Sequence, residues 1–271
     1  MSIIDVSDLR VWDQRNDEEI IKGLSFSVKE HSCLAIVGES GSGKSMTVKA
    51  ISGIHKPWIC CGGSIMFNGM DLLKTDQKKM RQVRGKQIFM IFQDGMSAFD
   101  PSCTIKSTLR EILLENLDCS KYEADSIMLE CMKKVLLKNP AEILKKYPHQ
   151  LSGGMLQRIM ISLAIALQPE IIIADEPTTS LDTITQYVVI NEFLRVKEQY
   201  GTAMIFISHD LGVVRKIADY IVVMRDGKMV EAGPAEELFC NPKQEYTRYL
   251  VDTRKALGEN YKKLFTVKEH V

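Results

Sequence analysis

The sequence lacks any apolar run that approaches the roughly 20 residues a helix needs to cross a bilayer. Its first residues, MSIIDVSDLR, also lack the charged-then-apolar layout of a secretion signal. Neither charge is in excess, because Lys plus Arg and Asp plus Glu both total 35. We therefore expect a cytosolic location by default and no membrane span. The bulk charge gives no indication of nucleic-acid binding.

Cysteine pairs are scarce as well. The seven cysteines are an odd number without tight paired spacing, and we expect them to be mostly buried thiols in a reducing compartment. Cys60-Cys61 is the only doublet, and no second cysteine or histidine pair accompanies it, which argues against a metal or redox site there. A chain of 271 residues with 45% hydrophobic residues is instead typical of a globular protein with a sizeable core.

Short apolar runs alternate with helical patterns along most of the chain. CLAIVG, QIFMIFQ, EIIIAD and AMIFIS are typical of strands buried on both faces. This alternation predicts an α/β fold in which helices cover both faces of a mostly parallel sheet. The first strands, at 3–12 and 24–28, predict a small antiparallel side sheet. Residues from about 105 to 147 have helical spacing and almost no strand signal, which predicts an inserted α-helical subdomain.

A glycine-rich loop, GESGSGKS, matches the pattern G-x-x-x-x-G-K-[ST] between an apolar strand and a helix expected over Met46–Ile54. Glycines let backbone N–H groups approach phosphate oxygens, and a helix N-terminus favours anions. Lys44 would reach the terminal phosphates of a nucleotide, and the Ser45 hydroxyl would bind magnesium. The residues predicted to hold the nucleotide here are Gly38, Glu39, Ser40, Gly41, Ser42, Gly43, Lys44, Ser45 and Met46.

Polar side chains follow three further buried strands. IIIADEP delivers Asp175 and Glu176, of which one carboxylate can hold a magnesium shell and the other can orient or deprotonate water. His209 and Gln93 each end a strand, where ligands gather in parallel sheets. A single histidine is more often structural, so the spacing alone leaves its role open. An amide can contact both a metal-bound water and a neighbouring peptide without changing the charge.

A second glycine pair occurs in LSGGMLQR, at the start of an apolar-faced helix. Ser152 is a good N-cap, and the glycines allow close approach to the helix terminus. Two interpretations remain open on these grounds. The segment is either a well-capped helix without a ligand or a second anion site.

Taken in order, these segments resemble the motifs of the ATP-binding subunit of an ABC transporter. GESGSGKS resembles Walker A, Gln93 the Q-loop, LSGGMLQR the signature motif and IIIADEP Walker B; the D-loop at Ser180–Asp182 and the switch histidine His209 follow. The resemblance covers nearly the whole chain. It implies one nucleotide-binding domain, with a RecA-like core at about 1–94 and 168–240, a helical subdomain at about 95–167 and a helical tail at about 241–271.

The context of the motifs is similar to the oligopeptide, dipeptide and nickel importer branch. MIFQDGMSAFDP, YPHQLSGGMLQR, IIADEPTTSLD and NPKQEYT carry this likeness, which is strongest to the nickel-import type. Two departures are Gly95, where the branch usually has proline, and QEYT in place of HPYT. Some dipeptide-type relatives hold an iron–sulfur cluster on C-terminal cysteines. No cysteine follows Cys240 here, so no cluster is expected.

The resemblance also assigns roles to site residues. ATP and Mg2+ are the implied cofactors, with Trp12 stacking on the adenine, and with Ser45, Gln93 and Asp175 around the metal. Lys44, Gln93, Glu176 and His209 are the implied catalytic residues. Ser152, Gly153, Gly154 and Asp182 would act in trans, on the ATP of a second subunit.

The implied partners are a second ABC ATPase subunit, either a copy or a paralogue, two membrane permease subunits and, indirectly, an extracellular solute-binding protein. The protein would be peripheral, on the cytoplasmic face of the cell membrane, and would bind no nucleic acid. The helix-rich segment at Ala98–Lys146 would dock the permeases, with Phe99 and Ile105 lining that surface. The alternatives are a soluble ABC-type ATPase in a non-transport process and a nucleotide sensor without turnover.

Overall fold

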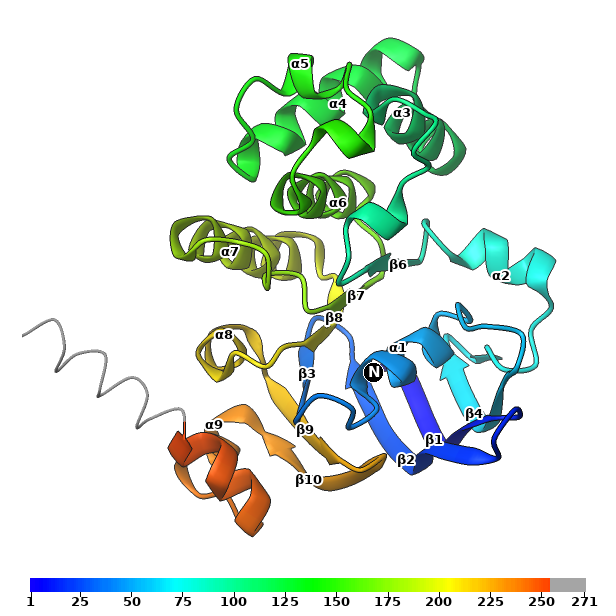
Figure 1. The fold of residues 1–271 in the computed structure, drawn as a ribbon, viewed down its shortest axis with the longest axis vertical. Coiled ribbons are helices and arrows are strands. Elements are labelled where there is room, and N and C mark those ends of the chain that lie inside the picture. Colours follow the sequence, from blue (N-terminus) through cyan, green and yellow to red (C-terminus); the bar gives the residue numbers. More distant parts are fainter. Residues whose placement is uncertain (254–271) are drawn as a thin grey trace, which may run out of the picture.

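A six-stranded sheet forms the centre of the molecule in the computed structural model, which describes residues 1–253 (Figure 1). The strand order is β10-β9-β3-β8-β7-β6, and every neighbouring pair except β10–β9 is parallel. The strands are β3 (Cys33–Val37), β6 (Ile88–Ile91), β7 (Ile171–Asp175), β8 (Ala203–Ile207), β9 (Tyr220–Arg225) and β10 (Lys228–Pro234). All residues of β3, β7 and β8 are buried, as their continuous apolar runs predict. The expected mostly parallel sheet is confirmed.

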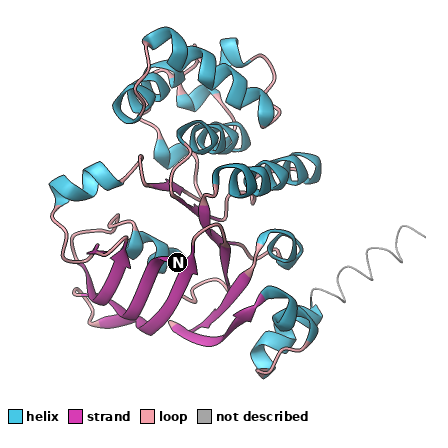
Figure 2. Cartoon of the chain, turned by 180° about the vertical axis from the view of Figure 1, so that it is seen from behind, coloured by secondary structure: helices cyan, strands magenta, loops and turns pink. Residues whose placement is uncertain are grey.

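An antiparallel sheet of four strands, in the order β2-β1-β4-β5, lies beside the central sheet (Figures 1 and 2). Its strands are β1 (Ser2–Asp13), β2 (Glu18–Lys29), β4 (Ile59–Phe67) and β5 (Met70–Asp71). Asn68 and Gly69 form the tight turn between β4 and β5, and both have positive φ, as a two-residue hairpin turn requires. Leu24, Ile36 and Val48 share one buried cluster, so the two sheets and helix α1 (Lys44–Ile51) enclose a common core.

Most of the remaining helices lie between β6 and β7 in the chain or cover the central sheet (Figure 1). They are α2 (Gln77–Val83), α3 (Ile105–Asn116), α4 (Lys121–Lys134), α5 (Pro140–Ile143), α6 (Gly153–Leu167), α7 (Thr183–Tyr200), α8 (Leu211–Ile217) and α9 (Ala235–Cys240), with short 3-10 turns η1 (Met96–Ala98) and η2 (Pro148–Gln150). The N-terminus of α4 is a capping box, in which Glu123 N donates to Ser120 Oγ and Ser120 N donates to Glu123 Oε2.

Helices α3 to α6 pack into one hydrophobic cluster, and an ion-pair network joins two of them. Arg110 on α3 donates from Nε to Oδ1 of Asp125 on α4 at 3.0 Å. Lys106 reaches the same carboxylate at 2.9 Å. These contacts fix α3 against α4.

The residues expected to line a permease-docking surface are buried instead. Phe99 and Ile105 are 7% and 0% exposed, and both belong to the core of the helical region. Ile105 begins α3 on the same face as Leu109 and Leu113, four and eight residues on, so this face is the interior one. The expectation that Phe99 and Ile105 form a docking surface is therefore wrong.

After α9 the chain turns back toward the central sheet and residues 245–253 are again helical. The rest of the expected helical tail, 254–271, lies outside the described residues. Within residues 1–253, no helix has the length and apolar character of a membrane span. The loops that follow β3, β6, β7 and β8 bring the motif residues together.

Candidate functional site

The loop after β3 has the backbone that its glycines predict. Gly38 and Gly43 have φ values of +150° and +100°. A Cβ on Gly38 would lie 2.1 Å from Met224 O, and one on Gly43 would lie 2.5 Å from Cδ1 of Ile21. Only glycine fits at these two positions, so the loop is closely wrapped at the N-terminus of α1.

The Lys44 side chain lies inside this loop. Its Nζ donates to Gly38 O at 2.9 Å and to Glu39 O at 2.7 Å, and the residue is 6% exposed. Burial lowers the pKa of Lys44, while nearby carboxylates, Glu176 foremost, oppose that shift. Ser42 adds a buried hydroxyl that has no hydrogen-bond partner in the part of the chain described. A buried cation and a free hydroxyl in a glycine loop fit phosphate oxygens as ligands.

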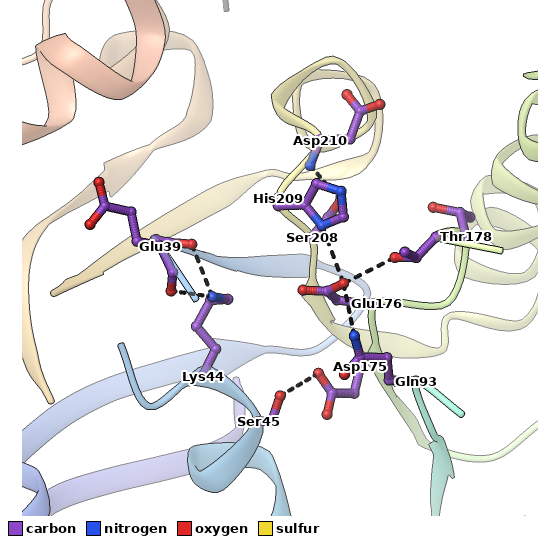
Figure 3. Close-up of polar contacts among 12 residues, drawn as sticks. Glu39, Lys44, Ser45, Gln93, Asp175, Glu176, Thr178, Ser208, His209 and Asp210 are labelled. Atoms are coloured by element: carbon purple, nitrogen blue, oxygen red, sulfur yellow. Dashed lines mark hydrogen bonds and ion pairs between the residues drawn. The ribbon is translucent and has the colours of Figure 1, made fainter. Parts of the chain in front are cut away.

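A hydroxyl and a carboxylate meet across the sheet beside the loop (Figure 3). Ser45 Oγ donates to Asp175 Oδ1 at 2.9 Å. Asp175 ends β7 and is 2% exposed, and this burial raises the pKa of its carboxyl, while the Ser45 hydrogen bond opposes the shift. Hydroxyl, carboxylate and the amide oxygen of nearby Gln93 are hard oxygen ligands of the kind that Mg2+ prefers. These residues therefore fit a magnesium ion bound with phosphate.

Three donors surround one oxygen of Glu176. Its Oε2 lies 3.2 Å from Gln93 Nε2 and 3.2 Å from His209 Nδ1 (Figure 3). Thr179 Oγ1 lies 3.0 Å from the same oxygen. Glu176 itself has a φ of +47°, uncommon for a residue other than glycine, and its N–H donates to Ile207 O. The backbone after β7 is thus fixed to β8, in a conformation that aims the carboxylate at Gln93 and His209.

Thr179 was not among the residues predicted from the sequence. It lies three residues after Glu176, and its N–H also donates to Glu176 O at 3.4 Å, so the two residues form one turn. Hydroxyl residues often bond a group a few positions away in such turns. The three-residue spacing between Glu176 and Thr179 is the sequence signal that indicates this turn.

The glycine pair of LSGGMLQR begins α6. Ser152 Oγ accepts from Met155 N at 3.3 Å, which confirms it as the N-cap. A Cβ on Gly154 would lie 2.9 Å from Ser180 O, whereas one on Gly153 would meet nothing within 4 Å. Gly154 thus packs on the loop after β7, and Gly153 leaves an open space at the helix terminus.

Two further contacts place the signature helix relative to the other motifs. Gln157 Nε2 donates to Phe92 O at 3.1 Å, which ties α6 to the residue before Gln93. Asp182 caps α7 and accepts from Thr185 and Ile184; the hydrogen bonds from Thr185 are the main cause of a lowered carboxyl pKa. Among the predicted site residues, Lys44 donates to carbonyls of its own loop, Ser45 pairs with Asp175, and Gln93 and His209 contact Glu176 (Figure 3). Ser152, Gly153, Gly154 and Asp182 lie at the starts of α6 and α7.

Trp12 is half-buried on β1, where its ring lies over Gly62 and its backbone pairs with Glu19 on β2. The next residues of β2 approach the phosphate loop, because a Cβ on Gly43 would lie 2.5 Å from Ile21 Cδ1 and 3.5 Å from Ile20 O. Trp12 therefore lies near the phosphate loop through β2. Its stacking role stays a prediction.

The Cys60-Cys61 doublet lies in β4, away from these strand ends. Burial raises the pKa of the Cys61 thiol to about 11, so the thiolate that a metal or redox site needs is disfavoured. The described residues contain no group of three or more His, Cys, Asp or Glu side chains that could hold a metal ion.

Chemically, the residues at the ends of β3, β6, β7 and β8 could bind phosphates, hold a cation and orient water. Lys44 and the loop amides would neutralise phosphate oxygens, and Glu176 would polarise a water in line with the terminal phosphorus. His209, Gln93 and Thr179 contact the Glu176 carboxylate and would orient it for that task. Phosphoryl transfer depends mainly on such positioning and charge.

Comparison with known proteins matches more than half of the chain to one family. A family model described as "ABC transporter" matches residues 21–179. The metal-staphylopine import system ATP-binding protein CntD of Staphylococcus aureus (strain NCTC 8325 / PS 47) is 43% identical over 97% of this chain and 97% of its own length. The dipeptide transport ATP-binding protein DppD of Bacillus subtilis (strain 168) is 41% identical over 89% of this chain and 73% of its own.

Solved structures show the same fold. The ATP-binding cassette MJ0796, in a dimeric post-hydrolysis state bound to ADP and Pi, aligns with a TM-score of 0.77 at 26% identity. The alignment covers 86% of this chain and 98% of that one. The ADP and Pi of that protein are the products of ATP hydrolysis.

Proposed function

The chain belongs to the ABC transporter family, and from that premise we propose that it is the ATP-hydrolysing subunit of an importer for a metal complex or a short peptide. The observation that carries ATP hydrolysis is the grouping of Gln93, Thr179 and His209 around one oxygen of Glu176, beside the Lys44 loop. A protein that only senses nucleotide has no need of an oriented carboxylate at that place.

Import is favoured over a non-transport process by the extent of the similarity. CntD is named for a metal-staphylopine import system and aligns over 97% of both chains. DppD is named for dipeptide transport and aligns over 89% of this chain. The alternative of a soluble non-transport ATPase is therefore not favoured.

The cofactors of this reaction would be ATP and Mg2+. The backbone amides of Gly38–Ser45 and the Lys44 ammonium would hold the phosphates, and Trp12 would stack on the adenine. Ser45, Asp175 and Gln93 would hold the magnesium ion, whose charge offsets that of the phosphates. No iron–sulfur cluster is expected.

A second ATPase subunit would complete each site. The open space beside Gly153 and the N-terminus of α6 form a positive helix end with room for a phosphate. Ser152, Gly153, Gly154 and Asp182 would then act on the partner's ATP, and the partner's equivalents on ATP held by Lys44. The dimeric state of MJ0796 supports this arrangement.

Permease subunits would dock in a groove of about 930 Å3 between α2, the β4–β5 turn and the end of α3. Lys79, Arg81 and Lys86 line it, with Glu115 on the α3 side. Such cations suit an acidic face or the negative C-terminal end of a short cytoplasmic helix. This groove takes the place of Phe99 and Ile105 as the proposed docking surface.

The cargo classes follow from the relatives. CntD is named for metal-staphylopine and DppD for dipeptides, so the proposed cargo is a metal chelate, nickel included, or a short peptide. A solute-binding protein outside the cell would deliver it to the permeases. The chain would lie peripherally on the cytoplasmic face of the membrane.

The test is to assemble the chain with its permeases and second ATPase in lipid vesicles and to measure phosphate release and uptake together. We expect ATP-dependent uptake of a labelled nickel chelate or dipeptide. Lys44→Ala should abolish both readouts by weakening nucleotide binding. Purification without any membrane protein, together with full ATPase activity of the isolated chain, would instead support the non-transport alternative.

A further inference from the structure

The segment after α9 makes a direct hydrogen bond to the phosphate loop. The backbone N–H of Glu39 donates to the hydroxyl oxygen of Tyr246 at 3.1 Å, across 207 positions of sequence. Tyr246 lies in NPKQEYT, one of the segments that resemble the importer branch and one that the proposed ATPase mechanism does not use. Glu39 is the second residue of the loop, directly after Gly38.

Tyr246 is itself firmly placed. It is 9% exposed, and the Arg225 guanidinium lies 4.8 Å from its ring centre. The chain just before it is held by Glu231 on β10, whose carboxylate accepts from Lys243 N at 2.8 Å and Gln244 N at 3.1 Å. Burial raises the pKa of the Tyr246 phenol, so it is protonated and neutral at physiological pH.

The backbone N–H and the carbonyl oxygen of Glu39 are thus both hydrogen-bonded, each to a different partner. Its N–H donates to Tyr246, and its carbonyl oxygen accepts from Lys44 Nζ at 2.7 Å and Ser42 N at 3.2 Å. Gly38 and Gly41 lie before and after Glu39, and glycine restricts the backbone least. The hydrogen bond from Glu39 N to Tyr246, which lies outside the loop, therefore helps to fix the conformation of the first turn of the loop.

We propose that Tyr246 is a positioning residue for the phosphate loop, so that docking of the C-terminal segment raises the affinity for ATP. The hydroxyl fixes the Glu39 peptide before nucleotide arrives, and less ordering entropy is then lost on binding. The segment from Lys243 to Tyr246 therefore connects β10 to the phosphate loop by hydrogen bonds. This inference rests on the proposed function only in that the loop binds ATP.

The experiment compares Tyr246→Phe with Tyr122→Phe as a control. Phenylalanine at position 246 keeps the ring beside Arg225 and removes only the hydroxyl that accepts from Glu39. Tyr122 lies on α4 in the helical region and is 83% exposed. Both variants are made in the full chain with Glu176→Gln, and ATP binding is measured by calorimetry. Hydrogen exchange of a peptide covering 36–42 reports on the Glu39 amide directly.

We expect Tyr246→Phe to weaken ATP binding about two- to tenfold, which is the range for the net loss of one neutral hydrogen bond. The Glu39 amide should exchange faster, while the melting temperature without nucleotide stays near that of the control. Unchanged ATP affinity in Tyr246→Phe overturns the inference, and so does a fall in melting temperature without a change in affinity. If Lys44→Ala also leaves ATP binding unchanged, the proposed function fails with it.

Discussion

The Nδ1 atom of His209 lies 3.2 Å from Oε2 of Glu176, the oxygen to which Gln93 and Thr179 also donate. These side chains follow three adjacent strands, β8, β7 and β6, whose parallel order brings their carboxyl ends to one edge. The carboxylate is held from both neighbouring strands. Its orientation is therefore a property of the sheet as well as of its own loop.

Replacing Glu176 with glutamine should separate binding from chemistry. The variant keeps the shape and the hydrogen bonds near the phosphate loop, so ATP affinity by calorimetry should be unchanged. It loses the charge that polarises water, and turnover should fall by two orders of magnitude or more, since one catalytic contact contributes about 3–4 kcal/mol. Steady-state phosphate release by the assembled complex measures this. Near-normal hydrolysis in the variant would contradict the assignment.

Thr179→Val should lower turnover about tenfold and leave ATP affinity as it is. The substitution removes the hydroxyl 3.0 Å from Glu176 Oε2, and a hydrogen bond to a charged group contributes about 1.5–3 kcal/mol, of which two other donors recover a part. Thr179→Ser keeps the hydroxyl and is the control, with expected turnover near the wild type. Equal phosphate release by the valine and serine variants would show that the Thr179 bond does not orient the carboxylate.

Much of the site was predictable because its residues directly follow buried strands. Asp175, Glu176 and His209 each come after a continuous apolar run, and parallel strand ends must meet at one edge. The family prediction and the mostly parallel sheet with its antiparallel neighbour are confirmed. The nickel type, the domain boundaries and the role of Trp12 stay predictions.

The remaining contacts could not be read from local patterns. Tyr246 meets Glu39 over a separation of 207 positions, which no periodicity encodes. Phe99 and Ile105 are buried in the core of the helical region, and the sequence does not show which apolar residues there are covered by neighbouring helices. Helical spacing identifies an apolar face, but its partner, and hence its exposure, depends on tertiary packing.

Asp125→Asn should weaken the helical region in a pH-dependent way. The hydrogen bond from Arg110 is the main cause that holds the pKa of Asp125 below its usual range. A lowered native pKa contributes stability above the unfolded value of about 3.9, and this contribution is lost as the pH falls through the native pKa. Urea unfolding at pH 7 should show a loss of about 1 kcal/mol, which shrinks below about pH 4.

Glu142→Gln provides the control for that measurement. Its partner Lys145 is three residues away on an exposed surface, where ion pairs contribute little. Its effect on the free energy of unfolding at pH 7 should be much smaller than that of Asp125→Asn. An equal loss in both variants, or a loss in Asp125→Asn that does not change with pH, would exclude the Arg110 contact as the cause.

Alanine substitutions at the two adjacent glycines of the signature motif, Gly153 and Gly154, should affect the melting temperature differently. An added methyl on Gly154 would lie 2.9 Å from Ser180 O, so Gly154→Ala must displace backbone and should lower the melting temperature of the isolated chain by about 4 °C or more. A methyl on Gly153 meets nothing within 4 Å of its own chain. Because alanine favours a helix over glycine, Gly153→Ala should keep or raise the melting temperature.

In the assembled complex, Gly153→Ala should lower phosphate release although it does not lower the melting temperature of the isolated chain. If the start of α6 closes on ATP held by a second subunit, the methyl on Gly153 occupies the space intended for that nucleotide. Phosphate release by the complex should then fall about tenfold or more in Gly153→Ala, despite its intact fold. Isolated chains would bind ATP on the proposed Lys44 site alone, so the ATP affinity of the isolated Gly153→Ala chain should not change. Full activity of the Gly153→Ala complex would mean that this helix end is only a well-capped terminus and that the second subunit's ATP is held elsewhere.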